Sequence, residues 1–196
     1  MSARGHPVMQ SPHRVQPSAR RASRARPTVT PRCRSTARCA SYRLSTAIAR
    51  GPSGERAIGA GEFFLDYLTT ALAPGEILTG IRVPKLGPGW GYRYEKFHLT
   101  AQAWAIVGVA ALARRADGHV AEARIGLTNM GLVPVRARAA EEAVAGAEAS
   151  AQALRSAAER ADEGTQPPSD LHGGSDYRRH LARVLTARAL AAASGV

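Results

Sequence analysis

Residues 102–128 read QAWAIVGVAALARRADGHVAEARIGLT, and this stretch decides the fold. Residues 102–112 are apolar at most positions, which predicts a central strand covered on both faces. Asp117-Gly118 then readily supplies the positive φ angles of a tight hairpin turn. Residues 120–128 alternate, and four of their side chains are predicted to face inward: Ala121, Ala123, Ile125 and Leu127. The stretch therefore predicts two antiparallel strands that are neighbours in one sheet.

Shorter elements are expected before this hairpin. Residues 55–58 predict a short strand, and the apolar-rich residues 62–68 predict a short helix. Residues 76–83 alternate between two faces, one carrying Ile77, Thr79, Ile81 and Val83, and the other carrying Leu78, Gly80 and Arg82. Residues 90–98 predict another strand, on which one face carries Tyr92, Tyr94, Lys96 and His98.

Three helices are expected after the hairpin. Residues 136–147 and 150–161 are rich in Ala with Glu and Arg interspersed, a composition that favours helix. Ser175 or Asp176 is expected to cap the last helix, whose apolar stripe is Tyr177, Leu181, Val184 and Leu185. The predicted fold class is α+β: an antiparallel sheet of three or more strands packed against three C-terminal helices, preceded by a disordered basic leader.

The leader is separated from the rest by a change in composition near residue 50. Residues 1–50 hold eleven of the 27 Lys and Arg residues and none of the 15 Asp and Glu residues, so most of the net charge of +12 lies there. Such a composition predicts disorder, with a domain that begins between Gly51 and Gly61. A transit peptide, a twin-arginine signal at Arg20-Arg21 and a nucleic-acid-binding tail are alternatives. Translation of GC-rich DNA in a wrong frame explains more of the composition than any of these.

Several classes of function are disfavoured. Both cysteines, Cys33 and Cys39, lie in the leader, which leaves the domain without ligands for an iron–sulfur cluster. The histidines after the leader are scattered, so no metal site is expected, and no self-contained catalytic motif occurs. No apolar run reaches the roughly 18 residues of a membrane helix. We expect a cytoplasmic protein.

Two side chains stand out on physical grounds. Leu78 is the large apolar residue on the outward face of its predicted strand. Lys96 shares a strand face with tyrosines, so a cation and aromatic rings meet on one surface. The simpler interpretation is that Lys96 is a solvated strand residue and Leu78 an edge contact.

Five ordered blocks of sequence resemble one family. They are Glu76-Ile77-Leu78-Thr79 with Ile81-Arg82-Val83-Pro84, Tyr94-Glu95-Lys96-Phe97, Ala103-Trp104-Ala105-Ile106-Val107-Gly108-Val109, Gly126-Leu127-Thr128-Asn129-Met130-Gly131, and Ser175-Asp176-Tyr177-Arg178-Arg179-His180-Leu181. The family is the FAD-binding medium subunit of molybdenum hydroxylases, of the aerobic carbon monoxide dehydrogenase and xanthine dehydrogenase type. The similarity runs from about Gly51 to Ala193.

The resemblance implies a cofactor, partners and site residues. FAD would receive electrons from a small iron–sulfur subunit, while a large subunit with a molybdopterin centre oxidises the substrate. Residues in the positions of Leu78 and Lys96 contact the flavin in such subunits. A lysine near the ring would stabilise negative charge on the reduced flavin.

The chain also departs from the family pattern. The two glycine-rich loops and the Asp that belong to the FAD site in the family's N-terminal region have no counterpart in residues 1–50. We therefore expect 51–75 to be a remnant edge of the FAD-binding domain and 76–196 to be the C-terminal subdomain. The function implied is that of a truncated medium subunit that binds FAD weakly alone. The alternative is a non-enzymatic assembly or nucleic-acid-binding protein that uses the α+β domain for docking.

Overall fold

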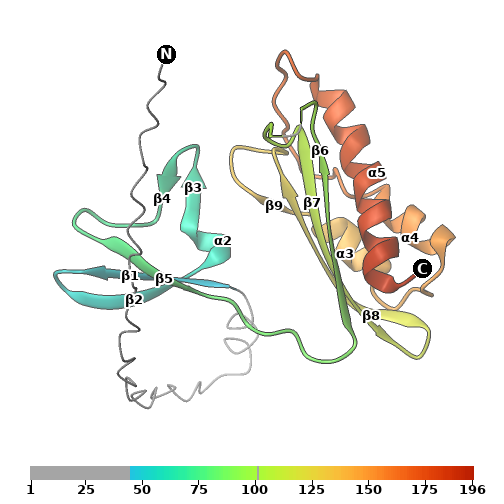
Figure 1. The fold of residues 1–196 in the computed structure, drawn as a ribbon, viewed down its shortest axis with the longest axis horizontal. Coiled ribbons are helices and arrows are strands. Elements are labelled where there is room, and N and C mark those ends of the chain that lie inside the picture. The colour runs from blue at the N-terminus through green and yellow to red at the C-terminus, as the bar shows by residue number, and fades with distance from the viewer. Residues whose placement is uncertain (1–44, 101) are drawn as a thin grey trace, which may run out of the picture. The chain divides into compact units, whose positions relative to one another are not determined.

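The computed structural model describes residues 45–100 and 102–196. Their helices and strands, in chain order, are β1 (Thr46–Gly51), β2 (Gly54–Gly59), α2 (Ala60–Phe63), β3 (Phe64–Asp66), β4 (Thr69–Thr70), β5 (Ile77–Arg82), β6 (Trp90–Phe97), β7 (Val107–Ala116), β8 (His119–Thr128), β9 (Val135–Arg136), α3 (Arg138–Val144), α4 (Ala151–Ala158) and α5 (Ser175–Ser194). Antiparallel sheets with three substantial helices confirm the α+β prediction (Figure 1).

The predicted hairpin is the centre of a four-stranded antiparallel sheet, ordered β6-β7-β8-β9. Asp117 and Gly118 have φ angles of 50° and 77°, as a turn of this type requires. The pairing jumps from Arg114–Glu122 to Arg115–Val120, which leaves Ala121 as an extra residue in β8. Because of this bulge Val120 is buried and Ala121 is exposed, so the prediction that Ala121 faces inward was wrong.

The helices cover one face of this sheet (Figure 1). In β7, Val107, Val109 and Ala111 are buried beneath them, whereas Ala110 on the other face is exposed. The expectation of a strand covered on both faces therefore fails for the described residues. Its N-terminal part, residues 102–106, also lies outside the strand, which begins at Val107.

Helix α5 differs from its prediction at its start. Its N-cap is Gly174, with no side-chain cap, so neither Ser175 nor Asp176 has the expected role. Instead, the backbone N–H of Ser175 donates to the Ser169 hydroxyl over 2.9 Å, and Asp176 lies 3.4 Å from the Arg179 guanidinium. The glycine cap exposes the first free N–H groups of the helix to the preceding loop, which supplies their acceptor.

The buried face of α5 is wider than the predicted stripe. Leu181 and Leu185 are buried as expected, but Tyr177 is exposed and Val184 only half-buried. Three polar side chains, three alanines and a leucine complete the face: Arg178, Thr186, Ser194, Ala182, Ala189, Ala193 and Leu190. Small residues let the helix lie close to the sheet.

The end of α5 is fixed tightly against the sheet. A Cβ atom added to Gly91 in β6 would overlap the carbonyl oxygen of Ala193 and lie 3.0 Å from its carbonyl carbon. The Arg115 guanidinium donates to the carbonyl oxygen of Ser194 over 2.7 Å. Gly195, with a φ of 67°, then ends the helix in the left-handed conformation.

A second sheet contains three strands in the order β2-β1-β5. Its central strand, β1, includes Thr46 to Arg50, which the composition had assigned to the leader. The ordered part thus begins before residue 50, because the apolar Ala47, Ile48 and Ala49 form the middle of a sheet. The remainder of the predicted leader, residues 1–44, lies outside the described residues.

Strand β5 belongs to this second sheet and not to the sheet of β6. It pairs with β1 over Ile77–Arg82, although the sequence analysis grouped it with the strands of the C-terminal subdomain; the subdomain start at residue 76 stays a prediction. The chain passes from one sheet to the other between Arg82 and Trp90. The long-range pairing with β1, a strand inside the predicted leader, places β5 in this sheet. The local alternation of β5 does not reveal that pairing.

The predicted helix over 62–68 was wrong beyond Phe63, because strand and turn follow. Helix α2 ends at Phe63, and Phe64–Asp66 forms β3, which pairs with β4. Leu68 has a φ of 54°, so the chain turns tightly between these two strands. A helix of so few residues is not stable without tertiary contacts, and the pairing of β3 with β4 forms here in its place.

One ion pair joins β2 to the start of β5. The Glu76 carboxylate accepts from Arg56 over 2.7 and 2.8 Å and from the backbone N–H of Ala73 over 2.7 Å. These hydrogen bonds, with that from Arg56 the largest, lower the pKa of Glu76 from 4.5 to about 2.

A pH dependence of stability follows from this lowered pKa. The carboxylate stabilises the fold fully above pH 4.5, and that contribution is lost as the pH falls toward 2. We expect the urea midpoint of the full chain to fall over this range, and Glu76→Gln to reduce the fall. Glu62→Gln, on the neighbouring helix α2, is the control. Equal pH profiles for Glu76→Gln and the unaltered chain would contradict the role of this pair.

Candidate functional site

The face of the four-stranded sheet that the helices leave uncovered carries the first predicted site residue, Lys96. Strand register aligns the side chains of this face in rows that cross β6, β7 and β8. Small residues occupy the middle of the rows, so the sheet surface is low there. Two adjacent rows are Lys96, Gly108 and Thr128, and Tyr94, Ala110 and Gly126.

Lys96 lies beside a tyrosine hydroxyl, in line with the sequence analysis. The Tyr94 hydroxyl oxygen would lie 2.8 Å from a Cβ atom on Gly108, which is the register partner of Lys96. Gly108 therefore gives the tyrosine room to extend across the neighbouring strand. Lys96 and Tyr94 are both exposed, on the face opposite Phe97, whose ring meets Tyr177 of α5 at 6.3 Å. The shared strand face of Tyr94 and Lys96 is thus confirmed.

Leu78 lies on β5, and its orientation is set by a bulge. Leu78 pairs with Ala49 and Ile81 with Ala47, so Thr79 is an extra residue in β5. Ala47 and Ala49 share one face of β1 because they are two residues apart. Leu78 and Ile81 therefore share that face too, and the prediction that they point to opposite sides was wrong.

The bulge has a hydrogen bond of its own. The Thr79 hydroxyl donates to the carbonyl oxygen of Ile48 over 3.1 Å. Leu78 remains partly exposed beside the small core of this sheet, which comprises Ala47, Ala49, Ile58 and Phe63. The structure thus places Leu78 and Lys96 on strands of different sheets, and their contact with a flavin stays a prediction.

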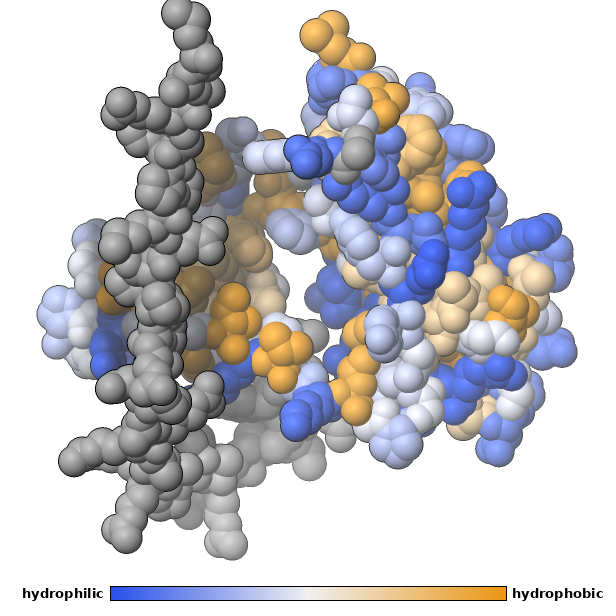
Figure 2. Space-filling model, viewed as in Figure 1, coloured by the Kyte–Doolittle hydropathy of each residue, from blue (hydrophilic) through white to orange (hydrophobic). Residues whose placement is uncertain are grey.

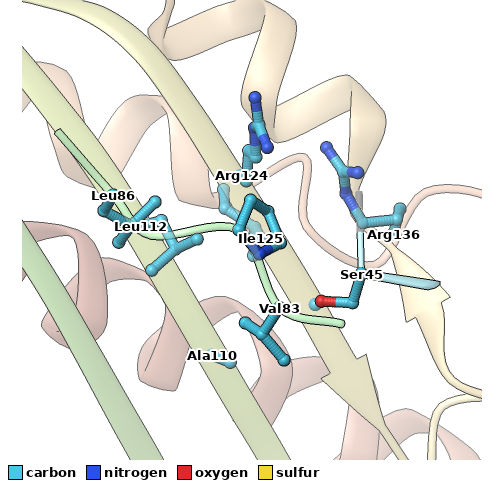
Figure 3. Close-up of a pocket in the computed structure, with 10 residues that line it drawn as sticks. Ser45, Val83, Leu86, Ala110, Leu112, Arg124, Ile125 and Arg136 are labelled. Atoms are coloured by element: carbon cyan, nitrogen blue, oxygen red, sulfur yellow. The ribbon is translucent and has the colours of Figure 1, made fainter. Parts of the chain in front are cut away.

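A cavity of about 360 Å³ lies over the open face next to these rows (Figure 3). Figure 3 shows Val83 and Leu86, from the segment after β5, beside Ala110 and Leu112 of β7. The lining is mostly apolar. Arg124 and Arg136 also border it, but the sequence analysis did not identify them.

The two arginines are already paired. Arg136 donates to both carboxylate oxygens of Glu141 over 2.6 Å. Arg124 donates to Glu122 over 2.7 Å, and its guanidinium lies 5.4 Å from the centre of the Trp90 ring. Their charges are therefore largely compensated, and Lys96 is the cation on this face with greater freedom to meet an incoming negative charge.

A second polar centre holds the loops at the end of the sheet. Arg178 is wholly buried, yet it is charged. Its guanidinium donates to the Ile106 carbonyl oxygen over 2.6 Å, to that of Gly173 over 3.3 Å, and to both carboxylate oxygens of Asp170 over 2.6 and 2.7 Å. The hydrogen bond from the His172 N–H and then the pairing with Arg178 lower the pKa of Asp170. The sequence analysis did not identify the pairing of Asp170 with Arg178.

No other chemistry is evident in the parts of the chain that the structure describes. They contain no group of three or more His, Cys, Asp or Glu side chains that could hold a metal ion. None of their helices combines the length and apolar character needed to cross a membrane. The open face of the sheet remains the leading candidate site.

Comparison with known proteins identifies the family. Residues 92–193 match the CO dehydrogenase flavoprotein C-terminal domain. This chain belongs to the CO dehydrogenase flavoprotein family. The match begins within β6. The resemblance described from the sequence blocks is thereby confirmed.

Named relatives support the assignment. The carbon monoxide dehydrogenase medium chain of Hydrogenophaga pseudoflava is 34% identical over 146 residues, which are 74% of this chain and 51% of the relative. The corresponding chain of Afipia carboxidovorans is 35% identical over 140 residues, 71% of this chain and 49% of the relative. The glyceraldehyde dehydrogenase medium chain of Sulfolobus acidocaldarius is 30% identical over 145 residues, 74% of this chain and 51% of that relative. This chain spans about half the length of these relatives.

Solved structures give the same result. A carbon monoxide dehydrogenase structure from Hydrogenophaga pseudoflava has a TM-score of 0.74 and 35% identity, covering 80% of this chain and 55% of that chain. Quinoline 2-oxidoreductase from Pseudomonas putida has a TM-score of 0.73 and 27% identity, covering 79% of this chain and 54% of that chain. The family therefore includes chains from complexes with different named substrates.

Proposed function

We propose that this chain forms the C-terminal part of a flavin-containing medium subunit in a molybdenum hydroxylase of the carbon monoxide dehydrogenase type. The observation that carries the proposal is the match of residues 92–193 to the flavoprotein C-terminal domain, together with an open sheet face that presents Lys96. In this proposal FAD takes electrons from an iron–sulfur subunit, and a molybdopterin subunit oxidises the substrate. The complex works in the cytoplasm.

The open face fits the flat ring of a flavin. Ala110 and Gly126 leave the sheet surface low beside Tyr94, whose hydroxyl end lies over Gly108, and Lys96 is on the same face. A planar aromatic ring needs such a shallow surface, and large side chains in these rows would exclude it. FAD would supply reversible storage of electrons, while the protein holds the ring and sets its potential.

Lys96 and Leu78 have different roles in this proposal. The Lys96 ammonium group lies on the open face and stabilises negative charge that the ring gains on reduction. Leu78 supplies apolar contact, and the Thr79 bulge fixes the direction in which it points. Neither residue binds the phosphates, so most of the affinity for FAD must come from elsewhere.

A chimera tests the proposal. The N-terminal part of the Hydrogenophaga medium chain, up to the point where the two sequences align, replaces residues 1–44. We expect this chimera to bind FAD tightly, as measured by quenching of flavin fluorescence, and the unaltered chain to bind it weakly or not at all. In the chimera Lys96→Ala should lower the reduction potential of the flavin, because the reduced, more negative form loses a nearby cation.

Two further variants make the result specific. Lys96→Arg keeps the charge with a different shape, so it should restore the potential only in part. Lys85→Ala removes the other lysine of the chain and should leave the potential unchanged. Tight FAD binding by the unaltered chain would contradict the weak-binding prediction. An unchanged potential in Lys96→Ala would return Lys96 to the status of a solvated strand residue.

A further inference from the structure

Strand β6 forms one outer edge of the four-stranded sheet, and in the described residues it pairs with β7 alone. The backbone N–H of Arg115 donates to the carbonyl oxygen of Gly89 over 3.2 Å, and these two residues continue the register of β6 and β7. In an antiparallel strand, every second residue points its backbone groups to the same neighbour. The backbone groups of Tyr92, Tyr94 and Lys96 therefore point away from β7, and none of the described residues pairs with them.

The other side of this sheet is closed. Strand β9 is only two residues long, and the segment after α3 lines the start of β8. There the backbone N–H of Gly146 donates to the carbonyl oxygen of Val120 over 2.8 Å, and the N–H of Val120 donates to that of Ala147 over 2.9 Å. Short strands and covering loops protect sheet edges against association. Strand β6 has neither protection, and its pairing with β7 is regular over eight residues.

The side chains of β6 are complementary to those of a second copy of the same strand. When two copies align antiparallel about Tyr94, Arg93 of each copy lies opposite Glu95 of the other. On the open face of the sheet, Tyr92 of each copy lies opposite Lys96 of the other. Opposite charges facing each other across two strands, and a cation beside an aromatic ring, both favour pairing. Arg93 already donates to Glu95 of its own strand over 2.6 Å, so the four charged groups would form one cluster.

The charges also select the register. The outward-pointing residues of β6 all have even numbers, so the two adjacent registers would be centred on Arg93 or on Glu95. Those registers place two arginines or two glutamates opposite each other, which is unfavourable. The middle of the edge is accessible, because the Arg93 side chain is 54% exposed and Tyr92 is 77% exposed. Helix α5 therefore leaves room for a second strand.

The surface of this part of the protein suits a polar contact between copies. Figure 2 shows hydrophilic side chains, in blue, over much of the part that holds the four-stranded sheet and its helices. After residue 50 the chain carries 16 Lys and Arg residues against 15 Asp and Glu residues. Two copies of this nearly neutral part repel each other little, so local charge pairs can decide how they meet.

We propose that the chain forms a homodimer in which two β6 strands pair antiparallel about Tyr94 and join their sheets edge to edge. Backbone hydrogen bonds supply affinity, and the charged pairs set the register. Tyr92 of the other copy then lies beside Lys96 on the open face, so each candidate site receives a side chain from both copies. The dimer does not depend on the flavin function, since it needs only the strand edge and its charges.

Charge exchange across the interface tests the dimer. Sedimentation velocity of the full 196-residue chain at physiological ionic strength should show an equilibrium between monomer and dimer. Arg93→Glu and Glu95→Arg should each weaken the dimer at least about tenfold, because each places like charges opposite one another. A mixture of these two variants should restore dimerisation, because every facing pair again has opposite signs. Arg155→Glu, the same charge change at an exposed position of α4, should leave the dimer unchanged.

Disulfide formation tests the register. With Cys33 and Cys39 replaced by serine, Tyr94→Cys should cross-link two copies under mild oxidation. The Cα atoms of residues at the two-fold axis lie about 5.5 Å apart, which a disulfide can span. Lys96→Cys in the same background should not cross-link, because its two copies lie roughly 13 Å apart along the strands.

Several outcomes would overturn the proposal. A chain that stays monomeric up to its solubility limit excludes the dimer, and a dimer that tolerates both single charge reversals is held by another surface. Circular dichroism shows whether the single variants fold. When both fold, absence of a heterodimer in their mixture contradicts the pairing of β6 with β6. Should either fail to fold, the cross-linking of Tyr94→Cys decides, and no disulfide there means that the proposal is wrong.

Discussion

Arg178→Ala is expected to destabilise the fold by about 3 kcal/mol, because it removes a fully buried charge that holds three chain segments together. The guanidinium bridges Ile106, Gly173 and Asp170. Its loss leaves the buried carbonyl oxygen of Ile106 with fewer donors and opens a cavity. Asp170 is partly exposed and regains water, which keeps the effect at the lower end of the range for buried pairs.

The neighbouring arginine provides a matched control. Arg179 pairs over 3.4 Å with Asp176, which is fully exposed, so Arg179→Ala should change the unfolding free energy by less than about 0.5 kcal/mol. Urea unfolding of the full chain measures both variants. Similar effects for the two substitutions would show that Arg178 contributes no more than a surface pair.

Gly91→Ala is expected to have a similar effect, also about 3 kcal/mol, for a steric reason. The added Cβ would overlap the backbone carbonyl of Ala193, and backbone at the end of α5 has little freedom to withdraw. The helix end is held by Arg115 as well, through the carbonyl oxygen of Ser194. The substitution should therefore lift the last turn of α5 from the sheet.

Gly126→Ala is the control for Gly91→Ala. Gly126 also lies in a strand of this sheet, but a Cβ there would meet nothing within 4 Å. It should be neutral or slightly stabilising, since alanine has fewer conformations to lose on folding. Hydrogen exchange of the amides in the last turn of α5 gives a second measurement. Unchanged protection in Gly91→Ala would mean that the helix accommodates the methyl group without moving.

Local chemistry predicted the centre of the fold well. Asp117-Gly118 needs a positive φ, and this dipeptide located the β7–β8 turn from the sequence alone. The bulges at Ala121 and Thr79 escaped prediction, because each depends on the register of a partner strand and not on the alternation of its own. The bulge in β8 reversed the predicted face of Ala121, and the bulge in β5 reversed the predicted faces of Ile77 and Leu78 relative to Ile81.

The part of the candidate site that depends on local sequence alone was predicted, and the part that depends on contacts between strands was not. Tyr94 and Lys96 lie on one regular strand, so alternation was enough to place them on a common face. The burial of Arg178 depends on a contact between residues distant in sequence, its hydrogen bond to Ile106. The pairs Arg124–Glu122 and Arg136–Glu141 are local, but alternation along a strand does not reveal them. A short motif rich in arginine gives no indication of which guanidinium is buried.

The position of α5 has a consequence for synthesis of the protein. Helix α5, which packs on β6 and β7, begins only at Ser175, so the ribosome completes the sheet well before this part of its cover exists. At roughly 5–20 residues per second, the apolar face waits on the order of several seconds for the last helix. During that interval the nascent chain exposes an apolar surface that other nascent chains and chaperones can bind. A stop codon or stalling within the codons of α5 would therefore favour aggregation and proteolysis of the incomplete chain.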